Sequence, residues 1–266
     1  MRQGTGDRMK VKAARLTITA IAGMPMVQPG DDVAGLLLKA VAANDLTLQR
    51  NDVLVVTQKI VSKAENRYLE LASVVPSERA NELATITGKS PQLVEAILSQ
   101  SSEVLRAKPG VLIVATQHGM VMANAGIDQS NLLPGTTGAR VLLLPEHPDR
   151  TAETIKARCD AHFSADIGVI VSDSVGRAWR QGTVGLAIGA AGVPSLWDRR
   201  GEPDLAGRPL EVTEVAFADA VASAAVLAMG EADEGCPAAL VRGLDWTAEA
   251  NPAAALIRPK SQDLFR

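Results

Sequence analysis

The stretch VSDSVGRAWRQG places Asp173 and Ser174 directly after a run of apolar residues. A carboxylate beside a hydroxyl can ligate a divalent cation, because hard cations prefer oxygen ligands. Arg177 and Arg180 follow and can clamp a phosphate or a carboxylate. Alternatively, the arginines neutralise Asp173 or lie on a solvated face. We favour a ligand site at the carboxyl end of a strand that spans residues 167–171, because a buried strand has no structural need for such a polar cluster.

Two further clusters are acidic. NAGIDQSN, residues 124–131, holds Asp128 in a tight turn that can present oxygen atoms to a cation, although such turns often only close Asx hydrogen bonds. MGEADEG, residues 229–235, brings Glu231, Asp233 and Glu234 just past a predicted helix C-terminus, where the helix dipole disfavours each by about 0.3–1 kcal/mol. A bound cation would reverse that cost, whereas in a solvated acidic turn it would be screened.

Two lysines, Lys59 and Lys63 in QKIVSKAE, can offset phosphate charge or serve only for solubility. Neither standard phosphate loop is present. Gly88-Lys89-Ser90 resembles the end of a Walker A loop, but Leu83 occupies the place of its first glycine, and we predict a helix-to-helix turn capped by Ser90. The histidines His118, His147 and His162 share no metal-ligand spacing, and we interpret them as incidental.

Composition limits the possible functions. The chain has 266 residues, 47% of them apolar, and 27 basic against 30 acidic residues, so no basic field draws it to nucleic acid or to an anionic membrane. The two cysteines lack a CxxC spacing, which suits a reducing cytoplasm. No uncharged apolar run is long enough for a membrane span, and aromatic residues are scarce.

The spacing of apolar residues predicts strands and helices along the chain. Strands are predicted at 16–22, 53–56, 111–115, 141–144, 167–171, 212–216 and 239–241. Helices are predicted at 31–43, 77–87, 90–107, 151–163 and 218–229. Because strands and helices do not alternate strictly, we predict a mixed α/β (α+β) fold rather than a doubly wound sheet. Residues 13–266 are expected to form a single catalytic domain after a flexible tail at 1–12.

The ordered motifs of residues 16–246 resemble those of the coenzyme F-420:L-glutamate ligase family, also called the coenzyme F-420-0:gamma-glutamyl ligases. They are GMPMVQPGDD, QKIVSKAE, PSERA, NAGIDQSN, VSDSVGRAWRQG with AIGAAGV, and MGEADEG followed by VRGL. The resemblance implies a GTP-dependent ligase that uses magnesium or manganese, is stimulated by potassium, and adds L-glutamate to the lactyl-phosphate side chain of a deazaflavin. It also implies an unusual two-lobed fold and an intertwined homodimer. Some relatives carry a C-terminal nitroreductase-like domain, which we do not expect in this chain.

The resemblance also assigns roles to residues of this sequence. It implies metal ligands at Asp128 and Asp173, with a second metal shared by Ser174 and Glu231. The implied GTP contacts are Met24, Pro25, Met26, Val27, Gln58, Lys59, Lys63, Asn131, Met229, Gly230, Glu231, Ala232, Asp233, Glu234, Gly235 and Cys236. The family often has Ser-Thr at Gln58-Lys59 and Thr at Ser174, so the first of these contacts departs from the pattern while the second keeps its hydroxyl.

Chemistry adds one more expectation. Because a carboxylate oxygen is a poor leaving group, amide formation requires an activated acyl group, and the γ-phosphate of GTP would supply it as an acyl phosphate. From their charge alone, we expect Arg177 or Arg180 to hold the anionic acceptor or the incoming glutamate.

Two alternative functions are a metal-dependent nucleotide phosphohydrolase and a non-catalytic deazaflavin or nucleotide sensor. Glutamate-dependent turnover separates both of them from the ligase.

Overall fold

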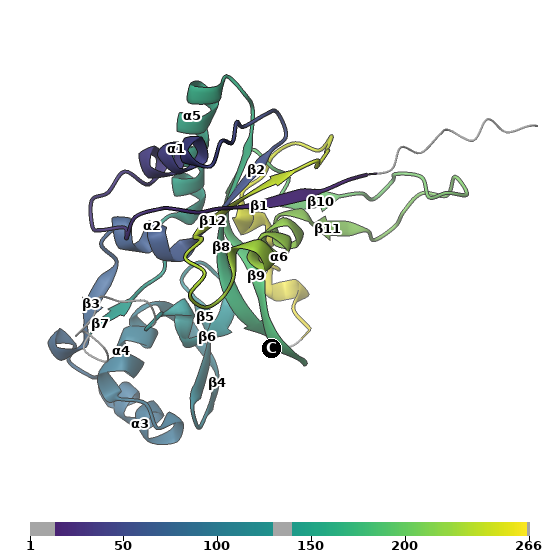
Figure 1. Ribbon diagram of the computed structural model, residues 1–266. Helices are drawn as coiled ribbons and strands as arrows, with labels where there is room; N and C mark the ends of the chain where they lie inside the picture. The colour runs from purple at the N-terminus through teal and green to yellow at the C-terminus, as the bar shows by residue number, and fades with distance from the viewer. Residues whose placement is uncertain (1–13, 130–139, 265–266) are drawn as a thin grey trace, which may run out of the picture.

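A twisted five-stranded sheet runs through the protein (Figure 1). The computed structural model describes residues 14–129 and 140–264. The strand order is β1 (Thr17–Ile21), β12 (Ala238–Arg242), β2 (Val53–Thr57), β8 (Gly168–Arg177) and β9 (Arg180–Ala191). Only β2 and β8 pair in parallel, and the other neighbours are antiparallel. This mixed sheet, with the helices around it, confirms the predicted mixed α/β class.

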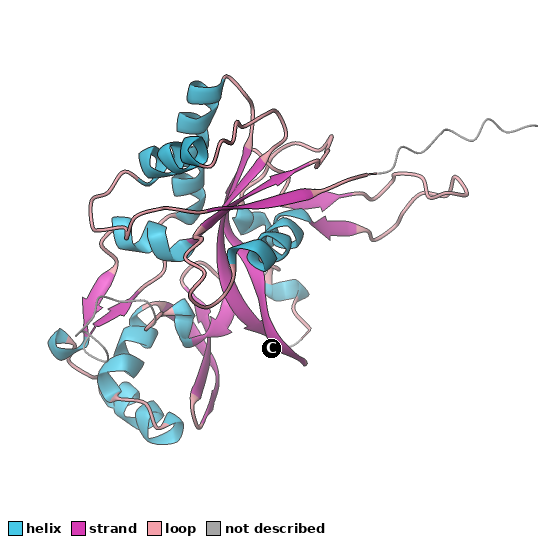
Figure 2. Ribbon diagram, viewed as in Figure 1, coloured by secondary structure: helices cyan, strands magenta, loops and turns pink. Residues whose placement is uncertain are grey.

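Helices cover both faces of this sheet (Figure 2). Successive side chains of a strand point to opposite faces, and in β2 Leu54 and Val56 join one buried cluster while Val53 and Val55 join the other. The first face is covered by α1 (Val33–Ala43), α2 (Gln58–Ala64) and α5 (Pro148–Phe163), and the second by α6 (Phe217–Met229). Burial on both faces explains why β2 is apolar from Val53 to Val56.

Smaller elements flank the central sheet. A three-stranded sheet of β4 (Ser101–Lys108), β5 (Val111–Thr116) and β6 (Val121–Ala123) packs with α3 (Glu78–Thr87) and α4 (Pro91–Ser99), and β6 also packs against β8. Two-strand pairs join β3 (Tyr68–Glu70) to β7 (Arg140–Leu142) and β10 (Leu196–Asp198) to β11 (Glu214–Ala216). The 3-10 turns are η1 (Leu71–Ser73), η2 (Asn124–Gly126), η3 (Ala253–Leu256) and η4 (Lys260–Gln262).

Local signals fix several helix ends, among them the start of the helix predicted at 31–43, for which Asp31 and Asp32 are both suitable caps. Asp32 caps α1 by accepting a hydrogen bond from the Gly35 amide, and α6 ends at Gly230. Gly88 ends α3 in the left-handed conformation, and the hydroxyl of Ser90 accepts from the Leu93 amide at the start of α4. The predicted turn at Gly88-Lys89-Ser90 is therefore confirmed.

The helix predicted at 90–107 is wrong in its second half, because α4 ends at Ser99 and β4 follows. Serine hydroxyls end the helix by bonding its last carbonyls, Ser99 to Ala96 and Ser101 to Ile97. The segment then pairs with β5. Within the described residues, no helix combines the length and apolar character of a bilayer span.

Candidate nucleotide and metal site

A cavity of about 860 Å³ lies past the end of β2. Thr57, the last residue of β2, pairs with Ser172, so the edge of β8 beyond Ser172 has no strand beside it from β2. The cavity fills this space, and its walls come from the loop 24–27, the start of α2, the segment 122–128, β8 and the loop 229–237. The predicted residues that line it are Met24, Pro25, Met26, Val27, Gln58, Lys59, Lys63, Asp128, Asp173, Ser174, and all of 229–236.

Asp173 and Ser174 lie inside β8 rather than after it, which corrects the predicted strand end at 171. The strand continues because β9 pairs with it as far as Arg177, with Asp173 opposite Leu186. Alternation then separates the two polar side chains. Asp173 falls on the same face as Val171 and Val175, toward α2, and Ser174 points to the other face, toward α6.

Asp173 and Asp128 form a carboxylate pair in the cavity. Burial, with the negative charge of Asp128 acting in the same direction, raises the pKa of Asp173 to about 7, against hydrogen bonds from the Ser174 amide and the Gln58 side chain. Asp128 is held by a β-bridge to Leu142 and forms an ion pair with Lys59 at 3.0 Å. A divalent cation between the two carboxylates would relieve their repulsion.

Lysines supply positive charge on the same wall. Lys63 is buried in α2, and burial together with the charge of Lys59 lowers its pKa, while Asp128 raises it. Gln58 is also buried and accepts a hydrogen bond from Ser62, which orients its amide toward Asp173. The cavity therefore brings two lysines and two carboxyl groups together from α2, the turn after η2, and β8.

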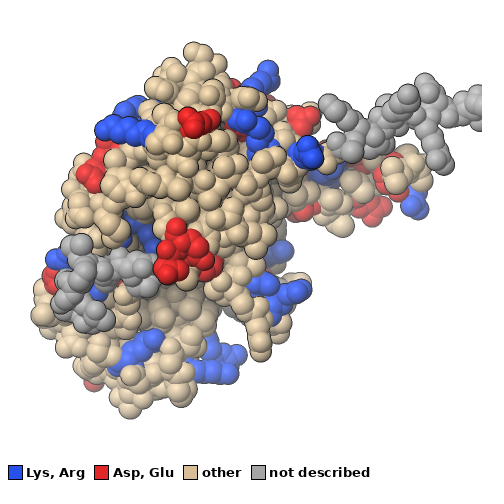
Figure 3. All heavy atoms as spheres, viewed as in Figure 1, with Lys and Arg blue, Asp and Glu red and all other residues tan. Residues whose placement is uncertain are grey.

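The second polar pair joins Ser174 to Glu231, with the serine hydroxyl donating to the carboxylate at 2.7 Å. Gly230 presents Glu231 from the end of α6 with φ 79° and ψ 171°, a conformation essentially restricted to glycine. A Cβ at Gly230 would also lie 2.1 Å from the carboxyl carbon of Glu234. Glu234 closes the loop by accepting from the Ala232 amide. The acidic patch at the centre left of Figure 3 lies where this exposed loop follows α6.

The donor set fits divalent metals that are shared with a ligand. Among residues 14–129 and 140–264, no three Asp, Glu, His or Cys side chains meet at one point, so the chain alone offers no complete metal cage there. It offers two oxygen pairs, Asp128 with Asp173 and Ser174 with Glu231. Magnesium commonly binds through one or two carboxylates, with phosphate oxygens and water completing its shell. These residues therefore fit two ions whose remaining ligands would have to come from water or from a bound phosphate compound.

Three predicted residues are not among those that line the cavity. Arg177 and Arg180 are exposed at the turn between β8 and β9, where Arg177 donates to the Gly182 carbonyl. Between them, Trp179 takes a left-handed conformation and is 80% exposed. Their predicted clamping role receives no support from the cavity and stays a prediction. Asn131 lies outside the described residues.

Several lining residues were missed from the sequence. Thr57 caps α2 and also lines the cavity. Met122, Ser172 and Thr183 line the cavity as well. A threonine at the end of the apolar run 53–56 was a usable signal for a helix start, and α2 itself was not predicted. Thr183 could not be found by spacing, because only the β8–β9 pairing brings it to the site.

Comparison with known proteins identifies the family of the chain. A family model described as F420-0:Gamma-glutamyl ligase matches residues 22–243. The coenzyme F420:L-glutamate ligase of Methanopyrus kandleri is 46% identical over 244 residues, which cover 90% of this chain and 93% of that protein. The proteins of the same name from Methanothermobacter thermautotrophicus and Archaeoglobus fulgidus are 43% and 40% identical, covering 94% and 95% of this chain and 99% and 97% of theirs. The chain belongs to the F420-0:gamma-glutamyl ligase family.

Proposed function

We propose that this protein is a GTP-dependent ligase that joins L-glutamate to the deazaflavin precursor of coenzyme F-420 through an amide bond. The observation that carries the proposal is that a single cavity gathers the described residues assigned to the nucleotide and both metals. They come from five separate parts of the chain and meet only in the folded protein. The names of the relatives, which specify a coenzyme F420:L-glutamate ligase, supply the reaction.

The chain's own residues would bind and orient the reactants. Asp128 with Asp173, and Ser174 with Glu231, would hold two divalent ions, magnesium or manganese. Bound there, the ions would neutralise the charge of the phosphates. Lys63 would offset further phosphate charge from α2. Catalysis of this kind rests mainly on positioning and electrostatics.

The bonds change in two steps. An oxygen of the acceptor carboxylate attacks the γ-phosphorus of GTP, the bond from that phosphorus to the β–γ bridging oxygen breaks, and GDP leaves. The glutamate nitrogen then attacks the acyl carbon and loses a proton, and the bond from that carbon to the phosphate oxygen breaks. The products are an amide, GDP and phosphate.

The family resemblance also carries proposals about assembly and ions. We include in the proposal a two-lobed fold, an intertwined homodimer and stimulation by potassium. Light scattering coupled to size-exclusion chromatography tests the dimer, and replacement of potassium by a larger organic cation tests the ion.

The reaction is tested by mass spectrometry on purified protein with GTP, magnesium or manganese, L-glutamate and the glutamate-free deazaflavin. We expect one GDP for each glutamyl residue gained by the deazaflavin. GDP without a deazaflavin product would favour a phosphohydrolase, and binding without GDP would favour a sensor. Either result would overturn the ligase proposal.

The effect of a substitution at Ser174 on kcat should depend on whether the hydroxyl is kept. Ser174→Ala removes the group that contacts Glu231, and we expect kcat to fall about 10- to 100-fold, because a hydrogen bond to a charged group contributes about 1.5–3 kcal/mol. Ser174→Thr keeps the hydroxyl and should retain kcat within about 3-fold of wild type, that is, within roughly 0.7 kcal/mol. Equal losses in both variants, in steady-state assays, would argue against a ligand role.

Glu231 should matter for turnover and little for stability. Glu231→Gln keeps the side-chain shape but removes the charge that an ion would need, so we expect kcat to fall by about 10²-fold. Because Glu231 is exposed, the melting temperature should not change. Glu249→Gln, an exposed carboxylate outside the cavity, is the matched control and should behave as wild type. A Glu231→Gln enzyme as active as this control would remove Glu231 from the site.

A further inference from the structure

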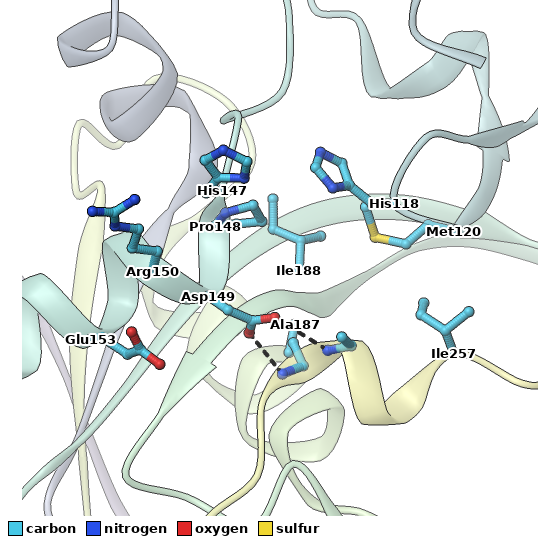
Figure 4. Close-up of a pocket in the computed structure, with 12 residues that line it drawn as sticks. His118, Met120, His147, Pro148, Asp149, Arg150, Glu153, Ala187, Ile188 and Ile257 are labelled. Carbon is cyan, nitrogen blue, oxygen red and sulfur yellow. Dashed lines mark hydrogen bonds between the residues drawn. The ribbon is translucent and has the colours of Figure 1, made fainter. Parts of the chain in front are cut away.

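A second cavity, of about 490 Å³, lies at the start of α5 (Figure 4). His118 and Met120 enter it from the β5–β6 turn, His147 and Arg150 from the first turn of α5, and Ile257 from the C-terminal segment. Three chain segments that are remote in sequence thus converge around Ile188 of β9. The cavity contains two of the three histidines that the sequence left without a role.

One acidic group in this cavity is already used by the fold. Asp149 accepts hydrogen bonds from the amides of Ala190 and Ala253 at 2.8 Å, and from Ala254 at 3.4 Å. It therefore ties the C-terminal segment to β9 and α5. The other polar side chains, those of His118, His147, Arg150 and Glu153, belong to exposed residues at the rim.

The floor of the cavity is apolar and is shaped by an irregularity in β9. The register of β8 with β9 pairs Val171 with Gly189 and Ser172 with Ala187, so it passes over Ile188. A bulge of this kind re-aims a side chain, and Ile188 lines the cavity with Met120, Pro148 and Ile257. Gly189 permits the arrangement, because a Cβ there would lie 2.3 Å from the backbone of Pro148.

The two cavities are neighbours on one face of the central sheet. Ile188 and Leu186 pack with the same buried cluster as Val171 and Val175, the face that also carries Asp173. Asp173 lies opposite Leu186, two residues before Ile188, which is about 7 Å along the strand. In the β5–β6 hairpin, Met122 lines the first cavity and Met120 the second, so this hairpin lies between them.

We infer that the second cavity binds the deazaflavin ring of the acceptor, while the acceptor carboxylate reaches Asp173 in the first cavity. This inference rests on the proposed function. An apolar floor with a thioether, and a rim of imidazoles and a guanidinium, is suited to the face and the polar edge of a flat heterocycle. A cavity of this size is typical of small-molecule sites.

Other substrates fit the second cavity less well. Free glutamate is small for a cavity of about 490 Å³ and has no flat apolar face to set against the floor around Ile188. The nucleotide needs the lysines and oxygen pairs, which line the first cavity. A long acceptor with a reactive carboxylate at one end and a ring at the other is the substrate that two adjacent cavities can share.

The test combines ring binding with steady-state kinetics. The probe is the deazaflavin ring lacking the lactyl phosphate, titrated by fluorescence against metal-free protein without GTP. We expect Ala254→Trp, which fills the cavity from an exposed position, and His118→Ala, which removes a stacking partner, each to weaken binding about 10-fold. His162→Ala, an exposed histidine outside both cavities, is the control and should bind as wild type.

In the ligase assay, the same two variants should raise KM for the full acceptor about 10-fold. Their kcat and their KM for GTP and glutamate should stay at wild-type values. An unchanged acceptor KM in an active enzyme would overturn this inference while the ligase proposal stands, and a raised glutamate KM would assign the cavity to the amino acid instead. A wild-type protein that binds the ring in this cavity but forms no amide would overturn the ligase proposal and leave the ring site.

Discussion

Asp173→Asn should lower kcat by at least ~10³-fold while the protein keeps its fold by circular dichroism. Asparagine retains an oxygen that can accept from the Ser174 amide, so the local structure of β8 is preserved. It lacks the charge needed beside Asp128 to hold a divalent ion. Metal stabilisation of transferring phosphoryl groups is worth several kcal/mol, and each 1.36 kcal/mol is a factor of about ten in rate. Steady-state assays at saturating metal measure the loss, and an Asp173→Asn enzyme with wild-type kcat would contradict the metal assignment.

Stability against pH gives an independent control for this variant in chelator-treated protein. Burial raises the pKa of Asp173 from its usual 3.8 to about 7, so the folded state favours the protonated carboxyl. The contribution of this carboxyl to the free energy of unfolding is complete below about pH 4 and is lost as the pH rises to about 7. The Asp173→Asn variant has no carboxyl at this position, so it does not lose stability in this way. Above pH 7 its melting temperature should therefore exceed that of the wild type, and a lower one would show that the substitution damages the fold.

Lys63→Met should raise KM for GTP by about 10- to 100-fold, which is the second large effect expected. Lys63 is buried in the wall of the first cavity, near Lys59 and Asp128. A charge-assisted contact to phosphate contributes about 1.5–3 kcal/mol, and methionine cannot replace it. The fold should not lose stability, because burial lowers the pKa of Lys63 and thus disfavours its charged form.

The matched control for Lys63→Met is Lys108→Met, since Lys108 is exposed in β4 and outside both cavities. Nucleotide titration by calorimetry should show weaker GTP binding for the first variant only. Equal GTP affinity in the two variants would remove Lys63 from the nucleotide site. Loss of the thermal transition in Lys63→Met alone would show that the lysine is instead needed for folding.

Local patterns predicted most helices and strands because their signals are contained in short segments. The apolar run 53–56 is β2, the caps at Asp32 and Ser90 start helices, and Gly230 ends α6. The continuation of β8 past Val171 could not be predicted, since it depends on pairing with β9. For the same reason the sequence could not show that Asp173 and Ser174 point to opposite faces.

The first cavity was predicted as a set of residues and not as a shape. Asp128, Asp173 and Glu231 carry chemistry that is visible in their residue types, and the resemblance to the ligase family groups them in one site. The second cavity was missed because His118 and His147 have no regular spacing. Both line the cavity because the β5–β6 turn and the start of α5 converge on β9, where the bulge turns Ile188 toward the cavity.

Transfer of oxygen from the acceptor to phosphate is the measurement that tests the central claim most directly. The acceptor is prepared with ¹⁸O in both carboxylate oxygens and turned over with unlabelled GTP and L-glutamate, and the released phosphate is analysed by mass spectrometry. If the carboxylate attacks the γ-phosphorus in the first cavity, each phosphate carries one ¹⁸O and the amide product keeps the other. Phosphate without label would mean that water attacks GTP, and the assignment of this cavity to acyl-phosphate chemistry would then be wrong.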